Sequence, residues 1–338
     1  MTTSRRTILL TSLAAPLAMP ALAQSRPILR VQTIGGLIEK TLREDVIPGF
    51  ERTHNIEVSL IVEDDVTILP KLQVARTRAP YDVCFMDNDK AILGQEAGLW
   101  APDVSARLRN LPAIYDSCKP PATGHYSAIV FQYALVYSTA RFATAPASWS
   151  DLWAPGLTVA VPHVSQGYGL TFLYVAALLN GGSAANLDPG FAAIKRLANF
   201  KVYRSVSQAL SLFQQKEVDA GQFYGHRAQQ MIEAGLPLAK TVPKEGTWGQ
   251  HTGLQIPKLT ANLDGAIAWI DTMLGVPAQT AMAKSLYSPT NRDCVFPPDQ
   301  QSRLVLGPAA DAVREIPWAE ILPQRDAILD RCTREFGT

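Results

Sequence analysis

The sequence predicts an α/β protein that folds into two lobes. Short apolar strands alternate with amphipathic helices near residues 26–130, and the same alternation returns near residues 140–242. This order favours a mostly parallel sheet with helices on its faces, built once in each unit. A chain of 338 residues is long enough for two lobes of ordinary size.

One stretch fits neither a helix nor a strand. The segment VPKEGTWGQHTGLQIPK, residues 242–258, contains three glycines between two prolines. Glycine permits unusual backbone angles or the close approach of another group, and proline fixes turns. We therefore predict connecting segments near residues 131–138 and 245–256 that act as hinges, with a cleft between the lobes.

The individual elements follow from apolar periodicity and from helix-end residues. In the first unit we expect strands at residues 29–33, 56–62 and 81–86, with helices from near Leu37 and within residues 65–80. In the second unit we expect strands at residues 157–161, 201–204 and 219–224, and helices at residues 168–179, 207–215 and 226–234. Beyond them, Asn262 caps an amphipathic helix and a final helix lies near residues 319–336. The predicted lobes are residues 26–132 with 253–285 returning to the first, and residues 138–245 with 290–338 packing mainly on the second.

Residues 1–23 have the composition of an export signal. Arg5 and Arg6 precede a short apolar run that ends in Ala21-Leu22-Ala23, which is typical of a cleaved signal peptide. The paired arginines fit a twin-arginine signal, and an ordinary Sec signal fits equally well. No cysteine follows the expected cleavage site, so we expect a periplasmic protein without a lipid anchor.

The charge of the mature chain is nearly balanced. Removal of residues 1–23 takes away two of 31 basic residues and none of 30 acidic ones, which leaves 29 against 30. Such a balance gives no electrostatic footprint for nucleic acid or for an anionic membrane. The expected partner is a small solute or another protein, and we expect a monomer.

Four cysteines, at positions 84, 118, 294 and 332, permit disulfides in an oxidising compartment. Cys84 lies in the apolar run YDVCFM and is expected to be a buried thiol. Cys294 and Cys332 are the pair we expect to be bridged.

Several short motifs occur in a fixed order along the chain. They are YDV at residues 81–83, WSDLW at 149–153, VDAGQFYG at 218–225, and PKEG at 243–246 followed by a strand and Ile256-Pro257. From about residue 28 onward this order resembles the periplasmic solute-binding proteins of ABC importers, and within them the spermidine/putrescine-binding group of extracellular solute-binding family 1. The resemblance implies a two-lobed type II periplasmic-binding-protein fold with two crossover hinge strands, and a membrane permease as partner.

The resemblance also implies a cationic ligand held by carboxylates and aromatic rings. Members of that group place Trp-x-Asp just after the PKEG turn, whereas this chain has Gln250, His251 and Thr252. No Asp or Glu occurs at residues 158–187, where another acid is expected, but the aromatic residue Tyr224 is retained. We therefore expect an amine-like or amino-acid-like ligand in place of a polyamine.

Loops at the carboxyl ends of strands line the crevice in open α/β folds. The candidate ligand-binding residues are Thr33, Gly35, Gly36, Asp87, Asn88 and Asp89 in the first lobe, Ser165, Gln166, Tyr224 and His226 in the second, and Trp248, Gln250 and Thr252 in the second crossover.

Several of these residues also fit a purely structural role. Asp87 or Asn88 would equally well cap a helix that starts near Lys90. Arg227 fits either the cleft or a solvated surface, and His226 is as ambiguous. Trp248 would either stack on a ligand or fill the interface between the lobes.

Two other classes of protein fit the sequence less well. An exported hydrolase would need a nucleophile and a base, but the chain has no GxSxG, HExxH, P-loop or SxxK pattern. A ferric-ion or metal-chelate binder on the same fold would use a pair of adjacent tyrosines, and this chain has none. Its five histidines are too scattered in the sequence to indicate a set of metal ligands. We expect a binding protein without catalytic residues, metal or cofactor.

Overall fold

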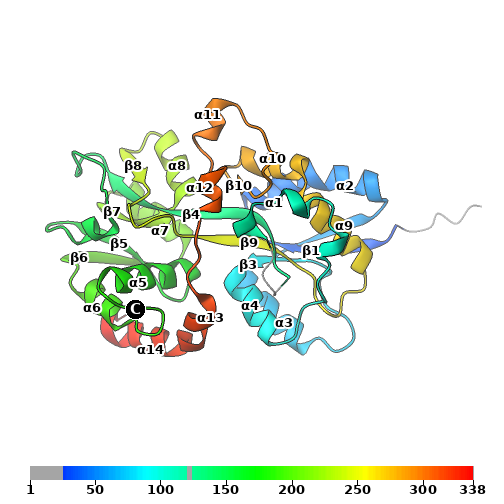
Figure 1. Ribbon diagram of the computed structural model, residues 1–338, viewed down its shortest axis with the longest axis horizontal. Coiled ribbons are helices and arrows are strands. Elements are labelled where there is room, and N and C mark those ends of the chain that lie inside the picture. The colour runs from blue at the N-terminus through cyan, green and yellow to red at the C-terminus, as the bar shows by residue number, and fades with distance from the viewer. Residues whose placement is uncertain (1–25, 120–123, 338) are drawn as a thin grey trace, which may run out of the picture.

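The structure is a computed structural model that describes residues 26–119 and 124–337. It has mixed α/β architecture, with strands meeting near the middle of the molecule and helices on both sides of them (Figure 1). The predicted export signal lies outside the described residues.

A parallel pair of strands begins the first unit. β1 (Ile28–Thr33) pairs in parallel with β2 (Glu57–Val62), and β3 (Cys84–Asp87) lies beside β1 through a parallel bridge between Val31 and Val83. The helices of this region are α1 (Leu37–Thr41), α2 (Ile47–His54), α3 (Ile68–Val74), α4 (Asn88–Glu96), α9 (Leu263–Leu274) and α10 (Val276–Lys284).

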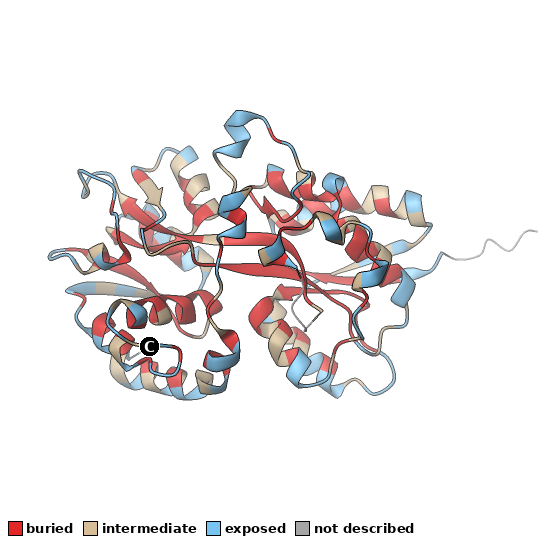
Figure 2. Ribbon diagram, viewed as in Figure 1, coloured by how far each residue is buried: buried red, intermediate tan, exposed pale blue. Residues whose placement is uncertain are grey.

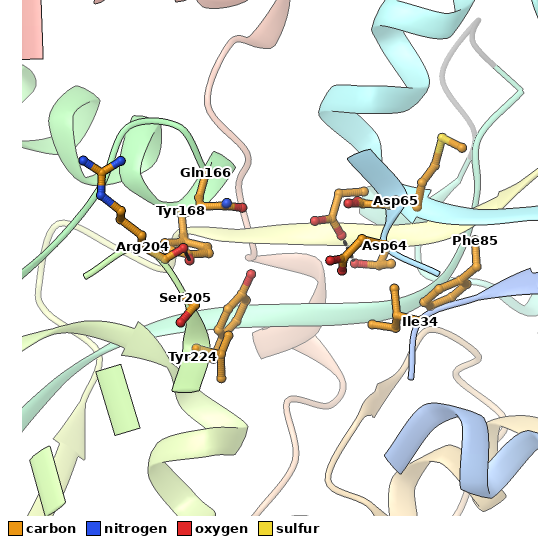
Figure 3. Close-up of a pocket in the computed structure, with 13 residues that line it drawn as sticks. Ile34, Asp64, Asp65, Phe85, Gln166, Tyr168, Arg204, Ser205 and Tyr224 are labelled. Atoms are coloured by element: carbon orange, nitrogen blue, oxygen red, sulfur yellow. Dashed lines mark hydrogen bonds between the residues drawn. The ribbon is translucent and has the colours of Figure 1, made fainter. Parts of the chain in front are cut away.

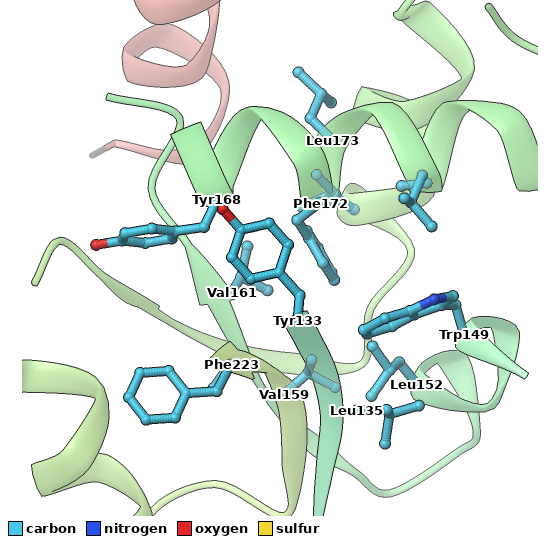
Figure 4. Close-up of a cluster of buried hydrophobic side chains, with 14 of the residues drawn as sticks. Tyr133, Leu135, Trp149, Leu152, Val159, Val161, Tyr168, Phe172, Leu173 and Phe223 are labelled. Atoms are coloured by element: carbon cyan, nitrogen blue, oxygen red, sulfur yellow. The ribbon is translucent and has the colours of Figure 1, made fainter. Parts of the chain in front are cut away.

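The strands of the second unit form one end of the larger, eight-stranded sheet. β5 (Thr158–Pro162) pairs in parallel with both β6 (Asn199–Tyr203) and β7 (Ala220–Tyr224), and β8 (Leu238–Thr241) follows at the edge. The helices are α5 (Gly167–Leu179), α6 (Asp188–Lys195), α7 (Val206–Gln214) and α8 (Gly225–Glu233). Figure 4 shows Tyr133, Trp149, Phe172 and Phe223 in the buried cluster that packs these elements.

The long strand β4 (Tyr126–Ser138) connects the two units. Its first half pairs antiparallel with β9 (Gly249–Gln255), and its second half pairs antiparallel with β7 and β8. β9 also pairs antiparallel with β3, so the sheet order is β3-β9-β4-β7-β5-β6. β4 and β9 correspond to the two connecting segments predicted near residues 131–138 and 245–256, and Figure 2 shows both strands as buried.

The glycines of residues 242–258 are explained by the close approach of backbones. A Cβ atom on Gly249 would lie 2.0 Å from the Phe131 carbonyl oxygen, and one on Gly253 would lie 2.3 Å from that of Tyr126. Gly246 has a backbone φ of 102°, a conformation that residues other than glycine rarely adopt. The group that approaches Gly249 and Gly253 closely is thus the backbone of strand β4.

The C-terminal segment contacts both cores. It comprises β10 (Ser288–Pro289), α11 (Pro298–Gln301), α12 (Pro308–Asp311), α13 (Trp318–Ile321) and α14 (Arg325–Phe336). β10 pairs with β4, and Val313 belongs to the core of the first unit. Ile316 and Cys332 belong to the core of the second. The chain therefore passes between the cores again near Glu315, and the lobe boundaries given above remain predictions.

Short helical turns complete the chain. A π-helical turn spans Leu42–Val46, and 3-10 helices span Asp65–Thr67, Ser105–Arg107, Leu111–Ala113, Asp116–Cys118, Trp149–Trp153 and Leu322–Gln324. None of the helices in the described part of the chain has the length and apolar character needed to cross a membrane.

The cysteine predictions have different outcomes. Cys84 is a buried thiol in a small apolar cluster, as expected. Cys294 is a free thiol near the surface, whereas Cys332 is buried in the core of the second unit. The predicted disulfide between Cys294 and Cys332 is therefore wrong.

The ion pair of Asp82 and Arg30 holds the start of β3 against β1. Asp82 is fully buried and accepts hydrogen bonds from the backbone and side chain of Arg30, from the Thr260 hydroxyl and from the Ala261 amide. Burial raises the pKa of this carboxyl, but the hydrogen bonds from Arg30 and Thr260 outweigh it and hold the pKa below its usual range.

We expect Asp82→Ala to lower the free energy of unfolding by about 3 to 5 kcal/mol, because it leaves a partly buried guanidinium without its partner. The contribution of Asp82 is present above its unfolded pKa of about 3.9 and is lost as pH falls through the lower folded value. Urea unfolding at pH 7 measures the loss. Asp330→Ala, at an exposed carboxylate, is the control; equal losses in both variants would contradict the role of the pair.

Candidate functional site

A cleft of about 380 Å³ opens at the carboxyl ends of strands from both units. The acidic wall consists of Ile34, Asp64, Asp65, Phe85, Met86 and Asp87. The aromatic wall consists of Gln166, Tyr168, Arg204, Ser205, Val206 and Tyr224. Figure 3 shows Asp64 and Asp65 of the first wall facing Gln166, Tyr168 and Tyr224 of the second. Thr252 of β9 completes the lining.

Carboxylates gather on the acidic wall because two strands end there. Asp64 and Asp65 follow β2, and Asp87 ends β3. Burial raises the pKa of Asp87 to about 7 and also raises the pKa of Asp65. The Thr252 hydroxyl donates a hydrogen bond of 2.5 Å to Asp87 Oδ1. The wall therefore presents carboxylates that lack full hydration and favour a cation.

Asp87 occupies the N-cap position of α4, but its side chain makes no capping hydrogen bond. It binds Thr252 across the β3–β9 pair instead. Asn88, the first residue of α4, donates from Nδ2 to Glu315 Oε2 at 2.5 Å. Neither Asp87 nor Asn88 therefore serves only as a helix cap.

Phenol rings form most of the aromatic wall. The rings of Tyr168 and Tyr224 meet edge to face with centroids 5.5 Å apart, and Tyr203 stacks behind Tyr168 at 5.7 Å. Burial raises the pKa of Tyr168 to about 12 and that of Tyr224 well above its usual value, so both phenols are neutral at pH 7. Neutral rings suit the hydrocarbon part of a ligand, and their faces attract cations.

Polar groups on the same wall suit an anion. Arg204 is exposed and lines the cleft, and Ser205 caps α7 by accepting a hydrogen bond from the Gln208 amide. Gln166 stands at the start of the 13-residue helix α5. Helix N-termini and a guanidinium both favour negative charge.

A polar cluster lies behind the cleft where the chain passes between the units. This hinge cluster consists of Asn88, Gln250, His251 and Glu315. Glu315 accepts from the His251 amide at 2.7 Å, and Gln250 Oε1 accepts from the Tyr133 hydroxyl at 2.6 Å. Burial raises the pKa of Glu315 to about 7 and lowers that of His251 to about 4.

Four of the sequence-predicted residues line the cleft, namely Asp87, Gln166, Tyr224 and Thr252. Others lie next to it. Gly35 and Gly36 form the turn after Ile34, Asp89 lies in the first turn of α4, and Ser165 bonds His163 at 2.7 Å. Asn88 and Gln250 belong to the hinge cluster, and Thr33 is fully buried.

Trp248 and His226 do not line the cleft. Trp248 is buried against Tyr174, with the guanidinium of Arg314 over its ring at 4.6 Å, and belongs to the core of the second unit. His226 stacks on Phe131 with centroids 4.9 Å apart, and burial lowers its pKa well below the usual value. Arg227 bonds Gln230 and does not line the cleft.

Sequence reasoning missed several cleft residues. They are Asp64, Asp65, Phe85, Met86, Arg204, Ser205 and Val206, whereas Ile34 and Tyr168 lie within the loops 33–36 and 165–168 that were expected at the cleft. The predicted residues come from the loops at the ends of four strands, near Ile34, Asn88, Ser165 and Tyr224. The same rule, applied to the strands that end near residues 62 and 203, identifies Asp64, Asp65, Arg204 and Ser205.

Within residues 26–119 and 124–337, no three or more His, Cys, Asp or Glu side chains are grouped so as to hold a metal ion.

The raised pKa of Glu315 makes stability depend on pH. Its unfolded value is near 4.5 and its folded value is about 7, so its contribution to stability is complete below pH 4.5 and is lost as pH rises through 7. We expect Glu315→Gln, which mimics the protonated acid, to raise the free energy of unfolding by about 1 to 3 kcal/mol at pH 8.5. At pH 4.5 the difference should be close to zero.

Urea unfolding at the two pH values measures this. Glu320→Gln changes an exposed carboxylate in the same segment and serves as the control. A gain in the Glu315 variant that is equal at both pH values would show that the folded protein does not hold a perturbed proton at this position.

Comparisons with known proteins agree with this architecture. A family model described as bacterial extracellular solute-binding protein matches residues 46–303. No significant match is found among curated protein sequences.

Solved structures with the same fold span nearly the whole chain. An ABC transporter from Clostridium perfringens is 22% identical, with a TM-score of 0.81 over 90% of this chain and 99% of its own. A GABA receptor is 18% identical, with a TM-score of 0.75 over 90% of this chain and 95% of its own. The spermidine/putrescine substrate-binding protein PotD from Streptococcus pneumoniae is 18% identical, with a TM-score of 0.71 over 90% and 99%.

At these identities the likeness establishes the fold, while the family model covers more than half of the chain. The resemblance to solute-binding proteins of ABC importers, inferred from the sequence, is confirmed. The chain belongs to the bacterial extracellular solute-binding proteins and has the type II periplasmic binding fold of ABC transporter substrate-binding proteins.

Proposed function

We propose that this protein captures a small solute bearing both an ammonium and an acid group, and delivers it to the permease of an ABC importer. The observation that carries the proposal is the opposition of charge across the cleft. Asp65 and Asp87 line one wall, and Arg204 with the starts of α5 and α7 lines the other. In this proposal the protein is exported to the periplasm and has no catalytic role.

The ammonium is expected on the acidic wall. Desolvation raises the pKa of Asp65 and Asp87, which means that both carboxylates gain more from a nearby cation than hydrated ones would. The rings of Tyr168 and Tyr224 supply π faces and apolar surface for the carbon chain between the two charges.

The acid group is expected on the opposite wall. Arg204 supplies the positive charge of this wall, because His226 is buried on Phe131 and Arg227 does not line the cleft. Among the compounds named for the similar structures, GABA carries both an ammonium and an acid group, whereas spermidine and putrescine carry only ammonium groups.

The test is calorimetric titration of the mature protein after unfolding and refolding to remove carried-over ligand. The panel contains ω-amino acids, monoamines, diamines, small carboxylates, sugars and ferric ion. We expect ω-amino acids to bind, Asp65→Asn to weaken every amine, and Arg204→Met to weaken only ligands with an acid group. Each loss should be about tenfold or more, as for one partner of a charged hydrogen-bonded pair.

Arg334→Met removes an exposed arginine on α14 and is the matched control. Binding restricted to sugars, or to ferric ion, would contradict the proposal, and the second result would favour the metal-chelate alternative.

A further inference from the structure

A cation of the protein lies beside the carboxylates of the acidic wall. Lys90 is the third residue of α4, and its ammonium lies 3.2 Å from Asp89 Oδ1, 3.4 Å from Asp65 Oδ2 and 3.9 Å from Asp87 Oδ2. Its side chain is only 14% exposed. The protein thus places one ammonium among the carboxylates that would attract the ammonium of a ligand.

Helix stability does not explain this position. The first turn of a helix disfavours a cation, because the unpaired amide groups there carry positive partial charge. Burial also lowers the pKa of Lys90, but Asp89, Asp65 and Asp87 outweigh this effect and raise the pKa above its usual value. Lys90 is therefore charged, and the three carboxylates hold it in place.

The charges in this group limit what else can bind. The three aspartates that contact Lys90 sum with it to −2 when all are ionised, and the sum is less negative near pH 7 because Asp87 is then partly protonated. Asp64 adds a negative charge to the wall, but it is exposed, so water and salt screen it. One further ammonium therefore nearly completes the pairing of the group around Lys90. A second ammonium would face the aromatic wall, whose six lining residues include Arg204 and no carboxylate.

We propose that Lys90 is a specificity-determining residue that restricts the ligand to a single positive charge, so that the cleft rejects diamines and polyamines. This inference rests on the proposed amine-binding function of the same cleft. The Lys90 ammonium already pairs with Asp65 and Asp87, two carboxylates that line the cleft, and its charge repels a second ligand ammonium that approaches them.

The test compares ligands that differ in one end group. GABA and putrescine share a four-carbon chain, and the same pairing of an ω-amino acid with a diamine is repeated for chains of two to six carbons. We expect the wild-type protein to bind each diamine at least about tenfold more weakly than its amino-acid counterpart. Lys90→Met, of similar length but uncharged, should bind diamines at least about tenfold more tightly than the wild type does.

Two variants separate this effect from a general change in charge. Lys40→Met removes an exposed lysine of α1 and should give no gain in diamine affinity. Lys90→Met combined with Asp89→Asn restores the sum of charges, and the gain should disappear. Thermal unfolding verifies that each variant is folded, and Lys90→Gln, also uncharged, takes the place of Lys90→Met if that variant does not fold.

The outcomes distinguish the two proposals. A wild type that binds diamines as tightly as amino acids overturns the role of Lys90 and leaves amine binding intact. A wild type that binds no amine, with a Lys90→Met variant that gains diamine binding, overturns the proposed function and supports the role of Lys90. Absence of amine binding in both proteins overturns both proposals.

Discussion

The backbone pairing of β4 with β9 is the constraint on which the rest of the structure depends. β4 runs for 13 residues and belongs to both units, because β9 pairs with its first half and β7 with its second. In this register Thr252 lies opposite both Asp87 of β3 and Ile129 of β4. A slip of one residue would turn Thr252 to the other face of the sheet and remove its hydrogen bond to Asp87.

The sequence predicts most of the fold because local patterns determine it. The helix expected at residues 168–179 is α5, Gly167–Leu179, and the strand expected at residues 219–224 is β7, Ala220–Tyr224. For β4 and β9 the residue pattern alone predicts only connections, and the family resemblance is what implies crossover strands, because a strand that is buried on both faces shows no alternation of apolar and polar residues. The glycines of β9 indicated a close approach, but their spacing does not identify β4 as the neighbour.

The site is less predictable because its contacts are long-range. Glu315 lies 227 residues from Asn88 and 64 from His251, in a segment with no regular pattern, so its burial among them follows only from the fold. Asp64 and Asp65 look like ordinary turn residues until β1 and β2 pair and bring the ends of the strands together. By contrast, Asp87 and Tyr224 were found because each lies where a recognisable strand ends.

A cleft that accepts one ammonium would need fewer carboxylates if binding were their only task, but the aspartates near Lys90 also support the structure. Asp87 holds β9 through Thr252, and Asp89 lies in the first turn of α4, where a negative charge is favourable. Removing either acid would lower the charge of the wall at a cost to the fold. A buried lysine lowers that charge while both acids keep their contacts. In the function proposed for this cleft, stability therefore sets the number of acids, and Lys90 sets the charge that remains for the ligand.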